Sequence, residues 1–162
     1  MNDEATNTAQ SENNLSFSIA SIYIKDVSFE TPNSPQIFMT QETFEIGMEL
    51  ANKAMQLNEE GLYEVTLTLT VTAKVKDSDK TAYLIEVNQA GIFNIANIDQ
   101  EHLGWMLGTY CPKILFPYAR QTISDLVTKG GFPLLLLAPV NFEAIYNNMQ
   151  ENAANPNRIA DA

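Results

Sequence analysis

YEVTLTLTVTAKV, residues 63–75, is the most regular stretch of the chain, because apolar and polar residues alternate over its whole length. Successive side chains of a β-strand point to opposite faces of the sheet. One face would therefore carry the residues Tyr63, Val65, Leu67, Leu69, Val71, Ala73 and Val75. The other face would carry mostly threonine, which is also favoured in strands. The pattern predicts a long antiparallel strand with one buried face and one face towards water.

The residues that follow predict the partner of this strand. The polar run KDSDK (76–80) is typical of a turn, and TAYLIEVNQAGIFNIAN (81–97) reads as the return strand of a hairpin. If Tyr83, Ile85 and Val87 lie on its buried face, then Leu84 and Glu86 point outward.

Two further strands are expected before the hairpin. The segment FSIASIYIKDVSFE (17–30) alternates, is rich in Ile, Phe and Tyr, and is apolar on both faces. Two prolines in TPNSPQ (31–36) then predict a loop or crossover. We read IFMTQETFEIGMEL (37–50) as a second, irregular strand, followed by a polar segment that ends at Gly61.

Helical patterns follow the strands. Asp99 is a good N-cap for a helix that carries apolar residues at helical spacing from Leu103 onward and ends at Gly130–Gly131. Pro112 and Pro117 should kink or divide this helix, since each removes an amide donor. Residues 132–140 are expected to be extended, and Asn141 can cap a last helix. Strands that precede helices predict the α+β class, with the helices on one face of an antiparallel sheet.

The composition predicts one domain over residues 1–162 and limits its partners. With 20 acidic and 9 basic residues, the net charge of −11 disfavours nucleic acid and anionic membranes and favours basic proteins. The polar residues 1–14 lack the features of a signal peptide, and no apolar run approaches the roughly 20 residues of a membrane-spanning helix. We expect a cytoplasmic protein with mobile tails at residues 1–14 and 153–162.

The sequence offers little support for catalysis. Cys111 and His102, the single cysteine and single histidine, could form a nucleophile and base. We favour a buried Cys111 and a solvated or capping His102, because nothing else of a catalytic arrangement accompanies them. A glycine-rich phosphate loop and a cysteine-cluster metal site are both missing from the sequence. We therefore expect no enzyme, no cofactor and no bound metal.

Apolar residues in excess of one core are the remaining feature. In the extended run Leu134–Leu137, one pair of side chains can face the core while the other pair must face elsewhere. Leu84 lies on the face expected to be wet. Such patches mark interfaces. At this point a contact between subunits and a surface for another polypeptide remain open as alternatives.

Five segments, taken in order, resemble the SecB family of bacterial protein-export chaperones. They are IYIKDVSFETPNSP, YEVTLTLTVTA, TAYLIEVNQAGIF, YCPKILFPYAR and FPLLLLAPVNFEAIY, and the resemblance runs from about Phe17 to Met149. It implies a four-stranded antiparallel sheet with two helices, the first of them interrupted, in a tetramer made of two dimers. It also implies a chaperone that holds precursor proteins unfolded without ATP and delivers them to the translocation motor SecA.

The resemblance also implies roles for individual residues. The positions that match contacts with SecA are Asp26, Glu30, Leu84 and Glu86. Those that match the tetramer contact are Ile85, Val87 and Gln89. The client grooves would be lined by Ile37, Phe38 and Phe44 on one side and by Phe132, Leu134 and Leu136 on the other. Glu42 falls near the place of a tryptophan that we associate with the first groove. Family tails help dock on a basic segment of SecA, and the C-terminal tail here departs from that pattern because it is Asn-rich and carries Arg158. The alternative function is a structural oligomer whose apolar surfaces serve only self-assembly.

Overall fold

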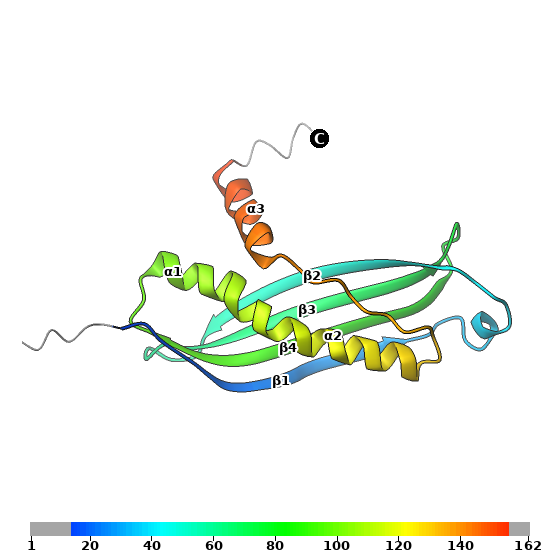
Figure 1. Cartoon of the computed structure of the whole chain (residues 1–162), viewed down its shortest axis with the longest axis horizontal. Coiled ribbons are helices and arrows are strands. Elements are labelled where there is room, and N and C mark those ends of the chain that lie inside the picture. Colours follow the sequence, from blue (N-terminus) through cyan, green and yellow to red (C-terminus); the bar gives the residue numbers. More distant parts are fainter. Residues whose placement is uncertain (1–13, 156–162) are drawn as a thin grey trace, which may run out of the picture.

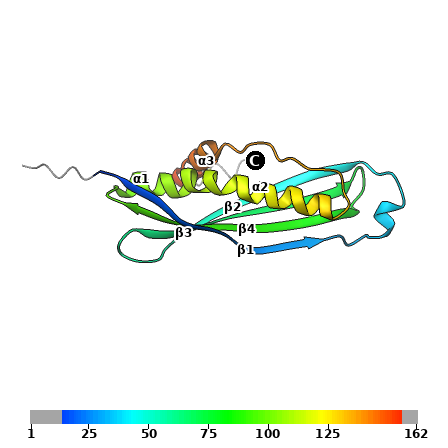
Figure 2. The ribbon, with the colours of Figure 1, turned by 60° about the horizontal axis from the view of Figure 1, so that its bottom comes forward.

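The computed structural model describes residues 14–155 and consists of one antiparallel sheet with helices on one side (Figures 1 and 2). The strands are β1 (Ser16–Glu30), β2 (Phe44–Gln56), β3 (Leu62–Val75) and β4 (Thr81–Ala96). Their order across the sheet is β1-β4-β3-β2, and all neighbours are antiparallel. The predicted strand and its hairpin partner are thus the two central strands. The remaining residues of the two predicted tails, 1–13 and 156–162, lie outside the described residues.

Strands β1 and β2 lie at opposite edges of the sheet, so the chain between them crosses its end. This confirms the crossover expected after residue 30. The second strand, however, runs over Phe44–Gln56 and not over residues 37–50. Residues Gln36–Phe38 form a 3₁₀ turn, and Ile37 turns into the core with only 2% of its surface exposed. The apolar residues at the start of the expected strand therefore belong to the crossover.

The edge strand β1 pairs with β4 in three short runs. Its register shifts by one residue between Ile19 and Ser21 and again between Ile24 and Asp26, as in a β-bulge. The extra residues at these places are Ala20 and Lys25.

The helical part of the chain begins at Asp99, whose side chain accepts a hydrogen bond from the backbone N–H of His102. Helix α1 (Gln100–Trp105) continues through a π-helical segment (Met106–Tyr110) into helix α2 (Cys111–Lys129). After an extended segment, residues 132–140, helix α3 (Phe142–Ala154) begins with Asn141 as its N-cap. All three helices lie on the same side of the sheet (Figure 2). No helix in the described part of the chain is long and apolar enough to cross a membrane.

The core lies between α2 and the two central strands. Every second residue of β3 is fully buried, as predicted: Val65, Leu67, Leu69, Val71 and Ala73. On the helix, four fully buried residues recur at intervals of four: Leu115, Ala119, Ile123 and Val127. Residues four apart lie on the same face of an α-helix. Burying a large apolar side chain contributes about 1.5–3 kcal/mol relative to leaving it in water, so these two rows account for much of the stability of the fold.

Helix α3 lies on the same side of the sheet as the first helix, as expected, and packs against that helix. The ring of Phe142 lies 6.0 Å from the ring of Phe116 on α2, measured between centroids. Nearby, Lys113 and Glu143 form an ion pair at 3.6 Å. The helix also extends to Ala154, so residues 153 and 154 belong to it and not to the expected tail.

The two prolines act differently from each other. Pro112 stands at the start of α2, directly after the π-helical segment, so the expected interruption is present there. Pro117 lies inside α2 without dividing it. The carbonyl that Pro117 leaves without a donor is that of Lys113, an exposed residue. Water can satisfy this carbonyl, which explains why the helix continues.

Pro112 also explains a contact between the helix and the edge strand β2. The N–H of Cys111 donates to the carbonyl of Met106, five residues earlier. The next bond of this series would join residue 112 to the carbonyl of Leu107, but proline has no N–H. Instead the side-chain amide of Asn52, on β2, donates to the Leu107 carbonyl at 3.0 Å. Asn52 therefore anchors the helix to the sheet at a carbonyl for which Pro112 offers no N–H in this register.

We expect Asn52→Leu to lower the free energy of unfolding by about 1–3 kcal/mol, because a part-buried carbonyl then has no donor. In a Pro112→Ala chain the new N–H can donate to that carbonyl, so Asn52→Leu should lower the free energy of unfolding clearly less. Urea unfolding of the unaltered protein, the two single variants and the double variant at one protein concentration measures this coupling. Equal costs in both backgrounds would contradict the pairing.

Cys111 is fully buried in this core, as expected, and burial raises the pKa of its thiol to about 12. Because the thiolate is the reactive form, iodoacetamide at pH 8 should label native Cys111 slower than the urea-unfolded chain by roughly a hundredfold or more. Mass spectrometry of the labelled chain over time checks this. Similar rates in both states would restore a reactive cysteine as a candidate.

Candidate functional site

The outer face of the sheet, which no described helix covers, brings together the four residues expected to contact SecA. Directly opposed residues of an antiparallel pair point to the same face. The register pairs Glu30 with Leu84, Asp26 with Asn88, and Glu86 with a serine of β1. Leu84 and Glu86 alternate with buried residues of β4, so they point outward as predicted. Asp26, Glu30, Leu84 and Glu86 thus share one surface on two neighbouring strands, which we call the acidic face.

The carboxylates of this face are free of ion pairs within residues 14–155. Lys25, the one basic residue of β1, binds instead to Glu64 on β3, with 2.6 Å between Nζ and Oε1. The hydroxyl of Tyr23 also donates to Glu64. The hydrogen bonds from Lys25 and then Tyr23 lower the pKa of Glu64, and the same contact raises the pKa of Tyr23 to about 12. Lys25 is therefore engaged elsewhere, and Asp26, Glu30 and Glu86 keep their charge available for a partner.

The predicted client residues lie at the other side of the sheet, where the crossover meets the end of α2. Phe132 is the centre of an aromatic cluster: its ring centroid lies 5.0 Å from that of Phe38, 5.9 Å from that of Phe44 and 4.8 Å from that of Tyr83. The two sides of the expected groove, residues 37–44 and residues 132–136, are thus in direct contact.

The leucine run beside this cluster alternates as predicted. Leu134 and Leu136 are 64% and 72% exposed, while Leu137 is buried and Leu135 half-buried. The carbonyl of Leu135 accepts a hydrogen bond from the hydroxyl of Ser124 on α2 at 2.7 Å, which fixes the run against the helix. Two large apolar side chains consequently project into solvent from a fixed backbone.

A cavity of about 330 Å³ lies between this run and the edge strand β2. It is lined by Glu42, Thr43, Phe44, Ile46, Tyr83, Pro133, Leu134 and Leu135. Glu42, the residue near the expected tryptophan, is therefore part of the wall. Only Phe44 and Leu134 of the lining residues were predicted for the groove, and the large apolar additions are Ile46, Tyr83 and Leu135. The alternation of β4 did place Tyr83 on the helix side, and its register with Ala73 could have pointed to this end of the sheet.

Two of the predicted groove residues lie beneath the surface. Ile37 is 2% and Phe132 6% exposed, so both form the floor under the accessible residues in this conformation. Phe38, at 48%, remains accessible. The difference arises because one face of the 3₁₀ turn packs on the core while the other faces water.

The three residues expected at the tetramer contact are also buried within the single chain. Ile85 and Val87 are fully buried and Gln89 is 2% exposed, on the face of β4 that α2 covers. The side-chain amide of Gln89 donates to the carbonyl of Tyr23. A direct contact of these side chains with another subunit is thus inconsistent with their burial, and any role in assembly would act through the helix above them.

The possible catalytic pair is not assembled. His102 is exposed at the start of α1 and its Nδ1 lies 2.6 Å from Oδ2 of Asp99, whereas Cys111 is enclosed in the core. The hydrogen bonds from His102, first from its backbone, lower the pKa of Asp99. Across residues 14–155 there is also no group of three or more His, Cys, Asp or Glu placed to hold a metal ion.

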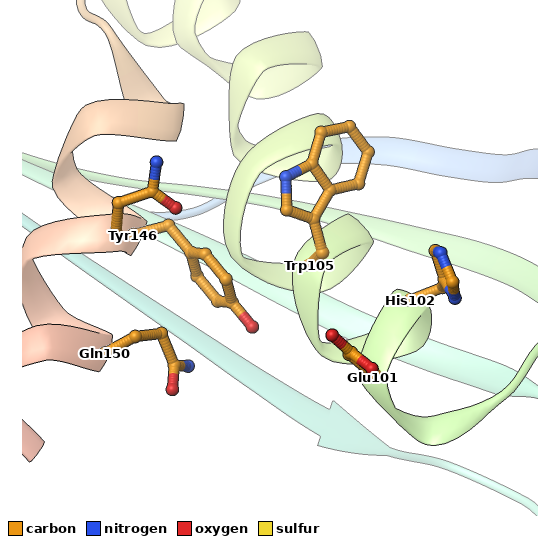
Figure 3. Close-up of a pocket in the computed structure, with 6 residues that line it drawn as sticks. Glu101, His102, Trp105, Tyr146 and Gln150 are labelled. Carbon is orange, nitrogen blue, oxygen red and sulfur yellow. The ribbon is translucent and has the colours of Figure 1, made fainter. Parts of the chain in front are cut away.

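A second cavity, of about 640 Å³, lies between α1 and α3 (Figure 3) and was not predicted. Trp105, on α1, and Tyr146, on α3, are among its lining residues. The sequence held no signal for it, because the two helices are more than thirty residues apart and their packing depends on the extended segment between them.

Comparison with known proteins assigns the family. The family model described as "Preprotein translocase subunit SecB" matches residues 10–153. A protein from Methylobacillus flagellatus named "Protein-export protein SecB" is 51% identical over 149 residues, which are 92% of this chain and 93% of that protein. A protein of the same name from Chromobacterium violaceum is 55% identical over 144 residues, 89% of this chain and 93% of that protein.

A solved structure supports the fold. It is described as the Mycobacterium tuberculosis Rv1957 SecB-like chaperone in complex with a ChAD peptide from the Rv1956 HigA1 antitoxin. Its TM-score is 0.61 at 17% identity, and the match covers 76% of this chain and 90% of that one. The family model and the relatives, which span nearly the whole described chain, show that this protein is a member of the SecB family.

Proposed function

We propose that this protein is an ATP-independent export chaperone, which holds precursor proteins unfolded and delivers them to SecA. Membership of the SecB family supports this function. The observation that carries it is the pair Leu134 and Leu136, which project into solvent beside the aromatic cluster. A monomer that served only as a scaffold would gain nothing from two such side chains in contact with water.

Holding an unfolded chain requires attraction that does not depend on sequence. Burial of apolar surface is non-directional, and the cavity beside the leucine run can accept side chains of several shapes. A client that buries about 1,000–2,000 Å² gains roughly 25–50 kcal/mol gross at about 25 cal/mol per Å². Ordering the client and the loss of its translational freedom offset most of this. Because the chaperone binds the unfolded state, it shifts the client away from folding by mass action.

Delivery would use the other side of the molecule. The acidic face lies on the uncovered side of the sheet, whereas the leucine run lies on the helix side. A client and SecA could therefore be bound together. Carboxylates without ion pairs attract a basic partner surface and accelerate its encounter.

Self-assembly is also supported by the edges of the sheet. On the helix side of the two edge strands, five large apolar residues are each more than 40% exposed: Ile19, Ile24, Val27, Ile46 and Met48. This is the surface that further subunits would cover in the proposed tetramer of two dimers. The structural-oligomer alternative uses the same surface but does not require Leu134 and Leu136 to stay accessible after assembly. A cytoplasmic location, without membrane insertion or nucleic-acid binding, is consistent with the net charge of −11.

Replacing Asp26 and Glu86 together with lysine should weaken SecA binding by roughly tenfold or more, because a basic surface then meets like charges. Client holding should be unchanged, since the leucine run is on the other side. Titration of SecA at two salt concentrations, with a refolding assay in parallel, measures both.

The matched control for this pair is Glu59→Lys with Glu60→Lys. It makes the same change in net charge in an exposed turn. Equal weakening in the control would attribute the effect to net charge, and loss of both activities in the first pair would indicate misfolding.

Replacing Leu134 and Leu136 with serine should weaken client binding by about one order of magnitude or more, at roughly 1 kcal/mol or more for each leucine that the client no longer covers. The measurement is the delay that the chaperone imposes on refolding of a slow-folding precursor. Leu57→Ser removes a leucine that is 42% exposed in the loop after β2, away from the leucine run, and should leave the delay intact. If the unaltered protein causes no delay, the structural-oligomer alternative is favoured.

A further inference from the structure

A hollow on the uncovered side of the sheet differs in charge from the acidic face. Its volume is about 360 Å³, and all four strands contribute to its lining, which consists of Lys25, Lys53, Met55, Glu64, Thr66, Thr68 and Asn88. The two threonines alternate with the buried row of β3, so they point away from the helices. Long side chains from the two edge strands and mostly short ones from the two central strands make the hollow.

The register places this hollow directly beside the acidic face. Asp26 of the acidic face pairs with Asn88, and Asn88 pairs with Thr68, so one row of the sheet borders both sites. Lys53 pairs with Thr66, two residues further along β3, and two residues of a strand span about 7 Å. A protein partner usually covers about 800 Å² of each surface. One that binds the acidic face would therefore also cover the hollow.

The single carboxylate of the hollow does not cancel its positive charge. Oε1 of Glu64 accepts from Nζ of Lys25 at 2.6 Å, and Oε2 accepts from the hydroxyl of Tyr23. These two hydrogen bonds come first among the causes that lower the pKa of Glu64, and the nearby charge of Lys53 lowers it further. Within residues 14–155, however, Lys53 forms no ion pair. Two lysines thus share one carboxylate, and one positive charge remains.

The polar groups that the hollow offers to a ligand are mainly donors. The hydroxyl of Thr68 donates to Oδ1 of Asn88 at 2.5 Å, which leaves the side-chain amide nitrogen to donate elsewhere. The ammonium of Lys53 and the hydroxyl of Thr66 can also donate. An incoming carboxylate would find these three donors. An incoming ammonium would be repelled by Lys53 and would have to share the oxygens of Glu64 with two groups that already bind there.

We propose that this hollow binds an aspartate or glutamate side chain of SecA, next to the basic residues of SecA that meet the acidic face. This inference rests on the proposed function and adds a contact of opposite charge to it. Attraction between two surfaces that each carry one sign of charge hardly depends on their relative orientation. A positive group beside a negative surface favours one orientation and rejects a partner that is basic throughout.

The variant Lys53→Gln separates this contact from the net charge of the chain. It makes the chain more acidic, so general attraction to a basic partner would strengthen binding. The proposed contact predicts the opposite change. The Kd for SecA should rise by about three- to tenfold, because a carboxylate of the partner then loses its ion pair. Calorimetric titration of the full chain with purified SecA at low salt measures this.

Two further variants serve as controls. Lys129→Gln removes the same charge from the exposed end of α2, on the helix side of the sheet, and should leave the Kd unchanged or slightly lower. Lys53→Arg keeps the positive charge and should retain most of the affinity.

Cross-linking locates the contact without dependence on an affinity. A carbodiimide joins a lysine amine to a carboxylate that lies against it, with an amide bond as the product. Mass spectrometry of the treated complex should identify Lys53 joined to an aspartate or glutamate of SecA. Lys53→Arg should bind SecA but yield no such product, because a guanidinium group does not react in this way.

Three outcomes would overturn the inference: binding of SecA that is unchanged or tighter with Lys53→Gln, equal weakening with Lys129→Gln, or a cross-linked complex in which Lys53 is never joined to SecA. The proposed function fails separately, because in that case SecA does not bind the unaltered protein at all. If SecA binds but ignores Lys53, only this contact is wrong.

Discussion

One helix is narrower than the four-stranded sheet, and this difference in width determines which apolar residues of the sheet stay exposed. An α-helix with its side chains is about 10 Å across, and two neighbouring strands lie about 4.8 Å apart. One helix can therefore cover two strands but not four. The row of residues from Leu115 to Val127 covers β3 and β4 and leaves the helix side of β1 and β2 only partly covered. The apolar residues left at both edges are a direct result of this geometry.

The extended segment 132–140 covers part of this deficit on the β2 side. Because it is a single strand of chain and has no sheet partner, its side chains alternate between the core and solvent. Leu137 therefore completes the core while Leu134 and Leu136 remain outside it. A helix in the same place could have turned all its leucines inward. The extended backbone thus links the stability of the chain to its capacity to bind others.

Period-two alternation made much of the fold predictable. It identified the central hairpin, the buried row of β3 and the outward direction of Leu84 and Glu86 without any tertiary information. Ile37 was misplaced because an apolar residue in a crossover looks the same in sequence as one in a strand. The burial of Gln89 and the anchor at Asn52 could not be predicted, because both depend on which carbonyl of a distant segment lacks a donor.

Some of the site residues could be predicted from the sequence, whereas others depend on tertiary contacts. Asp26 and Glu30 share a face with Leu84 because they lie in one uninterrupted run of the β1–β4 register. The resemblance to the family assigned these residues to one site, and alternation did not predict that the two strands pair. The cavity at Trp105 depends instead on how closely α3 packs against the first helix. The close contact of Tyr146 with Gly104 and Gly108 sets that distance. Sequence patterns describe the faces of single elements, but they do not specify the distance between two helices.

The register shifts of β1 reduce the tendency of this sheet edge to aggregate. Within the single chain β1 has a partner strand on one side only, and a long flat edge of this kind invites added strands and fibrils. In β1 the regular pairing runs only over Ser16–Ile19, Ser21–Ile24 and Asp26–Glu30. Each shift turns the backbone and interrupts the row of free amides. A client strand could thus dock on this edge for only a few residues before it lost alignment, which protects the chaperone from growing into an aggregate with its own cargo.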